Sequence, residues 1–202
     1  MSTTGLRDRR KRQTRQEISD IATRLFTERG FEDVTIAQVA AAAGVAKMTV
    51  TNHFPRKEDL VLDIHEEFVA RLGEVVAGRR DGESPLAALR RAYFADLARR
   101  DAMLGFAGPD FVRLITGSPT LLARLREIHE EREAPLAAAL TDEFDEFTAE
   151  LVAAHVVAVH RTLFREVQRR TLAEQDHDEI AAAVEPLAAR AFDALQRLLD
   201  AD

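Results

Sequence analysis

The chain has 202 residues and no cysteine, which excludes disulfide bonds, thiolate metal sites and thiol redox sensing. Its net charge of −7 argues, for the chain as a whole, against nucleic acid as a partner. No apolar run approaches the roughly 18 residues of a membrane span, and the N-terminus is charged where a signal peptide is apolar. We therefore expect a cytoplasmic protein with no membrane segment.

The charge is unevenly distributed along the chain. Residues 1–57 contain 11 Lys/Arg against 6 Asp/Glu, whereas residues 58–202 contain 17 against 29. This asymmetry predicts a phosphate-binding surface near the N-terminus and a remainder that repels DNA. The most basic stretch is either an arm that contacts phosphates or the minor groove, or a solvated tail. Its members are Arg7, Arg9, Arg10, Lys11, Arg12 and Arg15.

The first predicted helix has apolar residues at helical spacing from Ile18 to Phe26, and Gly30 is expected to end it. A second short helix follows, because Thr35 and Gln38 fit a capping box. Gly44 is expected to end that helix, since glycine enters the left-handed region without steric cost. This is the pattern of a helix-turn-helix, which places its second helix in the DNA major groove.

The second helix of this motif is expected over residues 46–53. At 100° per residue it buries Ala46, Val50 and Phe54. Its opposite face then carries small or polar side chains that can reach base edges or phosphates. The predicted DNA-binding residues are Thr35, Lys47, Met48, Thr49, Thr51, Asn52, His53 and Lys57.

These segments resemble the TetR family of one-component transcriptional regulators. The resemblance rests on R-x-x-I-x-x-x-A-x-x-L-F-x-x-x-G-F (Arg15–Phe31) and on T-I-A-Q-V-A-A-A-A-G-V-A-K-M-T-V-T-N-H-F-P-R-K-E-D-L (Thr35–Leu60), roughly a quarter of the chain. It implies that Thr35 and Lys57 touch phosphates. It also implies that the groove holds Lys47, Met48, Thr51 and Asn52.

The chain departs from the family pattern at three positions. Thr51 stands where an aromatic residue is usual, Met48 where glycine or alanine is frequent, and Ala46 where serine is frequent. The missing serine removes one helix-capping hydroxyl. These departures leave the fold prediction intact and leave the base preference open.

Beyond residue 60 the pattern stays helical, with breaks at residues 78–85, 105–109 and 117–119, and it lacks the period-two alternation of a sheet. We therefore predict an all-α protein. A three-helix, helix-turn-helix DNA-binding domain with its basic N-terminus occupies residues 1–57, and a helical-bundle domain occupies residues 58–202. The first helix of the bundle is expected to run from Leu60 to Val75.

The resemblance implies a small-molecule effector pocket within the bundle. The segment 103–115 is short, glycine-punctuated and aromatic, which suits a movable wall of such a pocket. For each candidate, ordinary core packing is the competing interpretation, and for His155 a backbone or carboxylate partner is another. The candidates are Phe94, Met103, Phe106, Phe111, Ile115 and His155.

The apolar stripes of the last two predicted helices indicate that the protein dimerises. Apolar stripes between Phe144 and Leu163 and between Ile180 and Leu198 suit a symmetric four-helix interface, and Thr141 is expected to cap the first helix. The family also dimerises through this region. Packing within one chain is the alternative. An i, i+4 stripe of like charge, at Arg161, Arg165 and Arg169, is expected to be neutralised by acidic neighbours on the final helix or to contact an anionic ligand.

The resemblance therefore implies a dimeric, ligand-responsive regulator, most often a repressor, that binds a palindromic operator when empty and releases it when the effector binds. Activation stays open. An enzyme is disfavoured, because the sequence has no phosphate loop, nucleophile elbow or H-E-x-x-H motif. An architectural DNA-binding protein is the second alternative. No cofactor or metal is expected.

Overall fold

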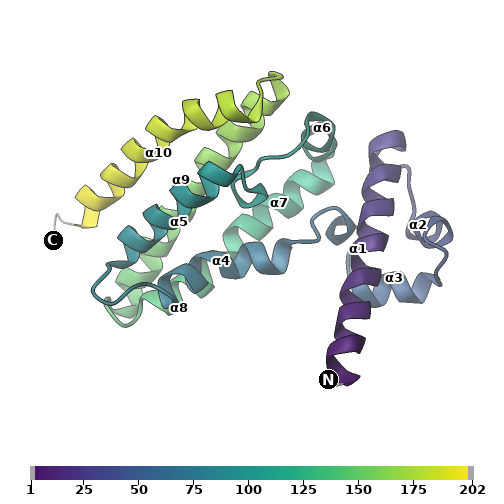
Figure 1. Ribbon diagram of the computed structural model, residues 1–202, viewed down its shortest axis with the longest axis horizontal. Coiled ribbons are helices and arrows are strands. Elements are labelled where there is room, and N and C mark those ends of the chain that lie inside the picture. Colours follow the sequence, from purple (N-terminus) through teal and green to yellow (C-terminus); the bar gives the residue numbers. More distant parts are fainter. Residues whose placement is uncertain (1–2, 200–202) are drawn as a thin grey trace. The chain divides into compact units, whose positions relative to one another are not determined.

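The computed structural model describes the backbone from Thr3 to Leu199 and the side chains from Arg9 onward. Within this range all regular structure is helical (Figure 1), which confirms the all-α prediction. The chain divides into two compact units. The first comprises residues 1–65 and 113–125, and the second comprises residues 66–112 and 126–202. The first unit therefore includes a stretch of chain far beyond the predicted N-terminal domain of residues 1–57.

The first unit is built on three helices, with α1 (Thr3–Arg29) packed against α2 (Ile36–Ala42), and α2 against α3 (Lys47–His53). A 3₁₀ turn, η1 (Glu58–Leu60), also contacts α1. The buried apolar side chains of these elements form one core, because each helix turns a single apolar face inward. They include Ile18, Ala22, Phe26, Val39, Val50, Phe54 and Leu60.

The second unit is a helical bundle in which α9 packs against α8 and α10, and α10 packs against α5 (Figure 1). Its core combines apolar faces from all of these helices. The elements from residue 65 onward are α4 (His65–Ala77), α5 (Pro85–Arg99), η2 (Ala102–Leu104), α6 (Pro109–Gly117), α7 (Pro119–Glu131), α8 (Glu133–Leu140), α9 (Glu146–Leu172) and α10 (His177–Leu199).

Two predicted helix starts are wrong. The helix expected from Leu60 begins at His65, because the chain first forms η1 and a turn in which the Arg15 guanidinium binds the Asp63 carbonyl oxygen at 3.1 Å. The helix expected to be capped by Thr141 begins at Glu146, and Asp145 caps it by accepting a hydrogen bond from the Thr148 amide. Thr141 instead ends α8, and its hydroxyl donates to the Ala138 carbonyl oxygen.

A close approach of α4 and α8 depends on Gly73. A Cβ atom at this position would lie 2.7 Å from the Pro135 carbonyl oxygen, a distance that real Cβ atoms do not reach. Pro135 lies in the first turn of α8, where a proline costs no helical hydrogen bond. The glycine and the proline together therefore define where these two helices touch.

Candidate DNA-binding surface and effector region

The turn before α3 sets the position of the predicted recognition helix. The capping box at the start of α2 is present, with the Thr35 hydroxyl accepting from the Gln38 amide and the Gln38 side chain accepting from the Thr35 amide. At the other end Gly44 adopts φ +66°, and the Val45 amide donates to the Ala40 carbonyl oxygen at 3.0 Å. These are the hydrogen bonds of a Schellman cap, which redirects the chain into α3.

α3 divides into a buried and an exposed face. Val50 and Phe54 are fully buried, as predicted, whereas Ala46 is exposed because it stands before the first turn of the helix. Met48 is 68% exposed, an uncommon exposure for a large apolar side chain. The predicted DNA-binding residues of α3 share this outward face to different degrees. Lys47 and Asn52 are exposed, and Thr49, Thr51 and His53 are half-buried.

Thr35 and Lys57 already have partners within the first unit. Thr35 is exposed, but its hydroxyl is engaged in the capping box. The Lys57 ammonium group donates to the Phe31 carbonyl oxygen and lies 4.2 Å from the centre of the Phe31 ring. In this structure Lys57 therefore ties the turn after α3 to residue 31 and is not directed into solvent.

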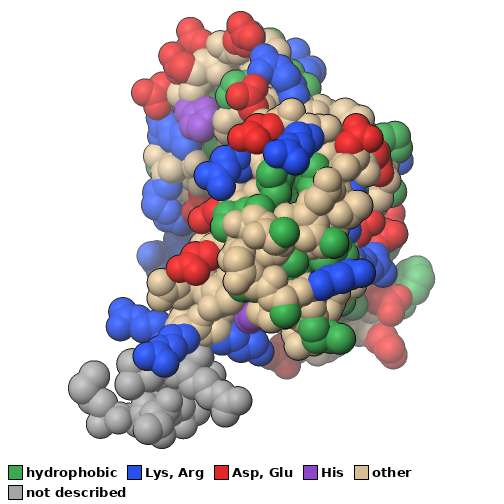
Figure 2. All heavy atoms as spheres, turned by 90° about the vertical axis from the view of Figure 1, so that its right-hand side faces the viewer, with side chains coloured by type: hydrophobic (Ala, Val, Ile, Leu, Met, Phe, Trp, Pro, Cys, Tyr) green, Lys and Arg blue, Asp and Glu red, His purple; other side chains and the backbone are tan. Residues whose placement is uncertain are grey.

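The basic stretch is helical, because α1 already begins at Thr3. Arg9, Arg10, Lys11 and Arg12 are exposed, and the Arg7 side chain lies outside the described residues. Figure 2 shows Lys and Arg side chains gathered at the lower left of the face drawn, at the height of the N-terminal half of α1. Arg15 differs from its neighbours, since it donates to the His53 carbonyl oxygen and lies over the Phe54 ring at 4.3 Å. It holds the end of α3.

The imidazole of His53 is a neutral group in this basic surrounding. Partial burial lowers its pKa, and the charges of Lys11 and Arg15 lower it further. A neutral imidazole can donate one hydrogen bond and accept another. His53 therefore adds hydrogen-bonding capacity beside the exposed face of α3 without adding charge.

The predicted effector-pocket residues come from several elements of the two units. Phe94 lies beside Tyr93 and Phe192, and Phe106 lies beside His177. Ile115 belongs to the first unit. His155 is half-buried, and its Nδ1 lies 2.7 Å from the Leu151 carbonyl oxygen of its own helix. Met103 and Phe111 are half-buried in η2 and α6.

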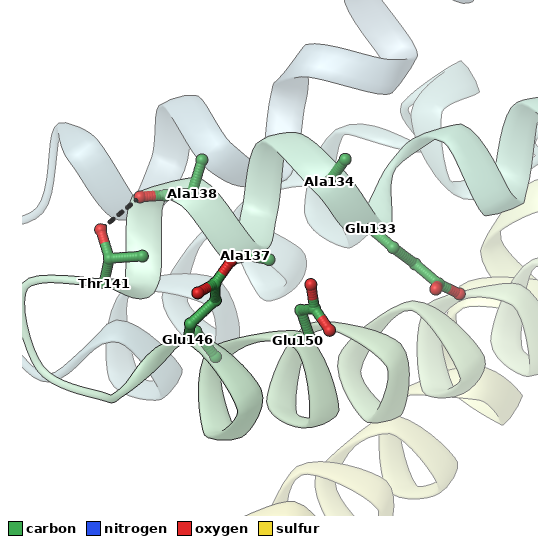
Figure 3. Close-up of a pocket in the computed structure, with 8 residues that line it drawn as sticks. Glu133, Ala134, Ala137, Ala138, Thr141, Glu146 and Glu150 are labelled. Atoms are coloured by element: carbon green, nitrogen blue, oxygen red, sulfur yellow. Dashed lines mark hydrogen bonds between the residues drawn. The ribbon is translucent and has the colours of Figure 1, made fainter.

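A groove of about 450 Å³ lies between α8 and α9 (Figure 3). Its lining includes alanines of both helices. Glu146 and Glu150 project from α9 toward α8. The residues lining this groove are Glu133, Ala134, Ala137, Ala138, Thr141, Glu146, Ala149 and Glu150. None of these is among the predicted pocket residues.

The second unit also contains a set of buried polar side chains that was not predicted from the sequence. Tyr93, His129, Arg132 and His160 are each at most 7% exposed and contain polar atoms without a hydrogen-bond partner. The signal was present in the sequence, because Arg124, Ile128 and Arg132 recur at a spacing of four residues. A charged residue that repeats on an apolar face indicates a buried cation.

A second buried arginine has a partner. In the first unit the Arg124 Nε of α7 lies 3.5 Å from the Asp59 Oδ1 of η1, and both side chains are buried. The other Asp59 oxygen accepts from the Arg56 amide at 3.1 Å. Nearby in the chain, the Ser118 hydroxyl donates to the Glu32 carboxylate at 2.9 Å. The segment before and within α7 is thus bound to the elements that carry α3.

The last two helices leave part of their apolar surface uncovered. Phe147 and Leu151 of α9 are exposed, Phe147 to 72%, and so is Leu198 of α10. Most of the predicted α10 stripe is buried within the chain, including Ile180, Val184 and Leu195. The alternative of packing within one chain thus describes most of the α10 stripe, and the exposed apolar surface lies mainly on α9.

These features define a helix-turn-helix protein whose second motif helix, α3, has an exposed face, with a helical second unit. Residues 18–64 match the family described as bacterial regulatory proteins, tetR family. The HTH-type transcriptional regulator TcmR of Streptomyces glaucescens is 35% identical over 212 positions, which cover 98% of this chain and 89% of TcmR. The chain belongs to the TetR family of transcriptional regulators.

A second relative is also a transcriptional regulator, and solved structures share the fold. The HTH-type transcriptional repressor AcnR of Corynebacterium glutamicum is 36% identical over 90 residues, 45% of each chain. Native NalD, a repressor of the MexAB-OprM multidrug efflux pump in Pseudomonas aeruginosa, has the same fold, with a TM-score of 0.57 at 18% identity over 90% of this chain and 97% of NalD. SmeT in a complex with triclosan gives a TM-score of 0.56 at 18% identity over 88% and 90% of the two chains. No helix in the described residues is long and apolar enough to cross a bilayer.

Proposed function

We propose that this protein is a ligand-responsive repressor that reads its operator with α3. The exposed face of this helix carries the proposal, because an exposed methionine beside Lys47 and Asn52 has no packing role. Asparagine pairs bidentately with adenine, lysine suits guanine, and a methionine side chain can meet a thymine methyl group. Thr49, Thr51 and His53 border this face and complete the contact surface.

Phosphate contacts come from the first unit in this proposal. The exposed Arg9, Arg10, Lys11 and Arg12 lie on the N-terminal half of α1 and supply positive charge near α3. Thr35 contributes through the exposed start of α2. Lys57 reaches a phosphate only by leaving the Phe31 carbonyl oxygen, so its contribution is smaller than that of the α1 side chains.

Dimerisation through the last two helices follows from the uncovered apolar surface of α9. Phe147 and Leu151 lie one turn apart, and apolar residues of this size are seldom left together in water. A twofold dimer places two recognition helices about 34–36 Å apart and predicts a palindromic operator. Phe147→Glu combined with Leu151→Glu should convert the dimer to a monomer in light scattering, and the exposed Thr162→Ala on the same helix should not.

Release of DNA is transmitted through α7 in this proposal. The first half of α7 belongs to the first unit and carries Arg124, which is paired with Asp59. The helix continues without a break to Glu131, and its second half carries His129 of the second unit. An effector that moves the second half therefore acts on the ion pair next to η1. TetR-type regulators bind small molecules, as the SmeT–triclosan complex illustrates.

A selection of genomic DNA fragments by the full chain at physiological salt tests this function. The repressor predicts a palindromic site enriched above the salt-dependent background. A protein that enriches no sequence would be an architectural DNA-binding protein or would need a co-ligand, and either result contradicts the proposal. Since its target is chromosomal DNA, the protein acts in the cytoplasm. A transcription assay on the selected site distinguishes repression from activation.

A further inference from the structure

Four buried side chains in the second unit have polar atoms that lack hydrogen-bond partners. These atoms are the Tyr93 hydroxyl oxygen, both ring nitrogens of His129, Nε of Arg132 and Nε2 of His160. Leaving a buried polar group unsatisfied is costly, and more so for a charged group. A protein that keeps several such groups together has a reason other than stability.

The four side chains lie in two groups of aromatic contacts, and Arg132 is near enough for its charge to lower the pKa of His160. The Arg132 guanidinium lies 4.2 Å from the centre of the Phe68 ring, and Phe68 stands edge-on to His129 at 5.2 Å. His129 in turn meets Phe164 at 5.1 Å. On the other side, His160 meets Tyr93 at 5.4 Å. The polar atoms therefore lie among flat apolar rings, which is an environment suited to an aromatic molecule.

The charge of this cluster is positive and uncompensated. Burial lowers the pKa of Arg132 to about 10, so the side chain stays charged at neutral pH. The pKa of His129 falls to about 3 through burial and through Arg132, Arg161 and Arg165. Within the described part of the chain, none of these three arginines pairs with a carboxylate. The expected neutralisation of Arg161 and Arg165 by the final helix is thus absent there, whereas Arg169 pairs with Glu166 of its own helix.

The other buried arginine differs from Arg132 in having a carboxylate beside it. Arg124 and Arg132 lie two turns apart in sequence and are similarly buried, yet Arg124 faces Asp59. An anion is the partner that suits Arg132 best, because guanidinium groups pair with carboxylates through parallel hydrogen bonds. The neutral imidazoles of His129 and His160 can donate to the same anion.

We propose that this cluster of Tyr93, His129, Arg132 and His160 is the recognition centre for an aromatic carboxylate. The carboxylate accepts hydrogen bonds from Arg132 and from an imidazole N–H group, and the ring packs among Phe68 and Phe164. Phe164 and Arg161 are half-buried and Arg165 is exposed, so the cluster meets the surface along this part of α9. The ligand enters where Phe164 moves aside. This assignment rests on the proposed function only in treating the ligand as the effector.

Binding of 1-naphthoate to the full chain, without DNA, tests the site by calorimetry. Its neutral amide, 1-naphthamide, has the same ring and serves as the comparison. The carboxylate should bind at least tenfold more tightly than the amide, and Arg132→Met should remove this preference. Arg126→Met, an exposed arginine on α7, should retain it. Equal affinity for acid and amide, or binding of neither, overturns the proposal.

A measurement without ligand tests the premise. Replacing an unpaired buried cation by an apolar side chain of similar length removes a desolvation cost, so Arg132→Met should raise Tm by about 2–8 °C. A fall in Tm would show that Arg132 has a structural partner and would overturn the proposal. Both measurements omit DNA, so a failed operator selection with intact naphthoate binding contradicts the regulatory function and not the site.

Discussion

The two units each bury an arginine contributed by the region of α7, and they treat it differently. Arg124 is paired with Asp59 in the first unit, and that carboxylate also accepts from the Arg56 amide. Arg132 in the second unit faces aromatic rings and two neutral histidines. A buried ion pair holds elements in place, whereas an unpaired buried cation is a cost that a bound anion would remove. The presence of a carboxylate beside Arg124 thus indicates a structural site, and its absence beside Arg132 indicates a candidate binding site.

The largest expected change in stability comes from removing the carboxylate beside Arg124, so that this arginine resembles Arg132. Asp59→Ala removes the buried carboxylate that faces Arg124 and accepts from the Arg56 amide, which should lower the free energy of unfolding by about 3–5 kcal/mol. Urea denaturation measures this loss. Replacing the exposed Glu28 of α1 by alanine should change stability by less than about 0.5 kcal/mol. If Asp59→Ala is as stable as the wild type, the ion pair does not hold α7 to η1.

Acid should destabilise the second unit through its histidines. An unfolded histidine binds a proton near pH 6.5, whereas folded His129 does so only near pH 3. The unfolded chain therefore binds more protons below pH 6.5, and stability falls as the pH is lowered toward 3. Between pH 6.5 and 5 the loss is about 2 kcal/mol for each such histidine. His129→Leu should reduce this pH dependence in denaturation curves, and the exposed His177→Gln should leave it unchanged.

The geometry of α2, the turn and α3 was largely predictable from sequence, and the buried polar cluster of the second unit was not. The Thr35 capping box, the Gly44 turn and burial of Val50 and Phe54 follow from local rules, because each depends on residues within one or two turns. Lys57 was predicted to reach phosphate, and its contact with Phe31 spans 26 residues that no local pattern connects.

The positions of helix starts are also hard to predict from local sequence alone. Thr141 and Asp145 are both good capping residues, and the choice between them depends on how α8 ends and where α9 packs. The buried cluster around Arg132 joins α4, α5, α7 and α9, so its members share no spacing along the chain. Only the four-residue spacing of Arg124, Ile128 and Arg132 in the sequence indicates it.

On the DNA-facing side, Asn52 is expected to contribute most to base recognition among the exposed α3 residues. Asn52→Ala should weaken operator binding by about 1–3 kcal/mol and relax the preference at one base pair of each half-site. Fluorescence anisotropy with the selected operator and single-base variants measures both effects. Thr162→Ala on α9 should bind as the wild type does. Uniform weakening on every sequence would instead assign Asn52 to a phosphate.

The smallest expected effect is a gain in stability at the start of α3. Ala46 precedes the helix with φ −69° and ψ 146°, and its side chain makes no capping hydrogen bond. Ala46→Ser should therefore stabilise the first unit by about 1 kcal/mol, as a rise in the denaturation midpoint. The same substitution at the exposed Ala41 should not stabilise the protein. Ala41 lies within α2 and not at its start, so a serine there has no unpaired helix-start amide to accept from. A matching gain at both positions would remove the capping explanation.

Operator affinity measured at saturating 1-naphthoate tests the link between the two units most directly. If the anion fills the Arg132 cluster and acts through α7, the wild type should bind its operator about 5- to 150-fold more weakly, and Arg132→Met should not respond. Unchanged operator affinity in the wild type at saturating 1-naphthoate would contradict the account, because the ligand would then not favour the state that releases DNA.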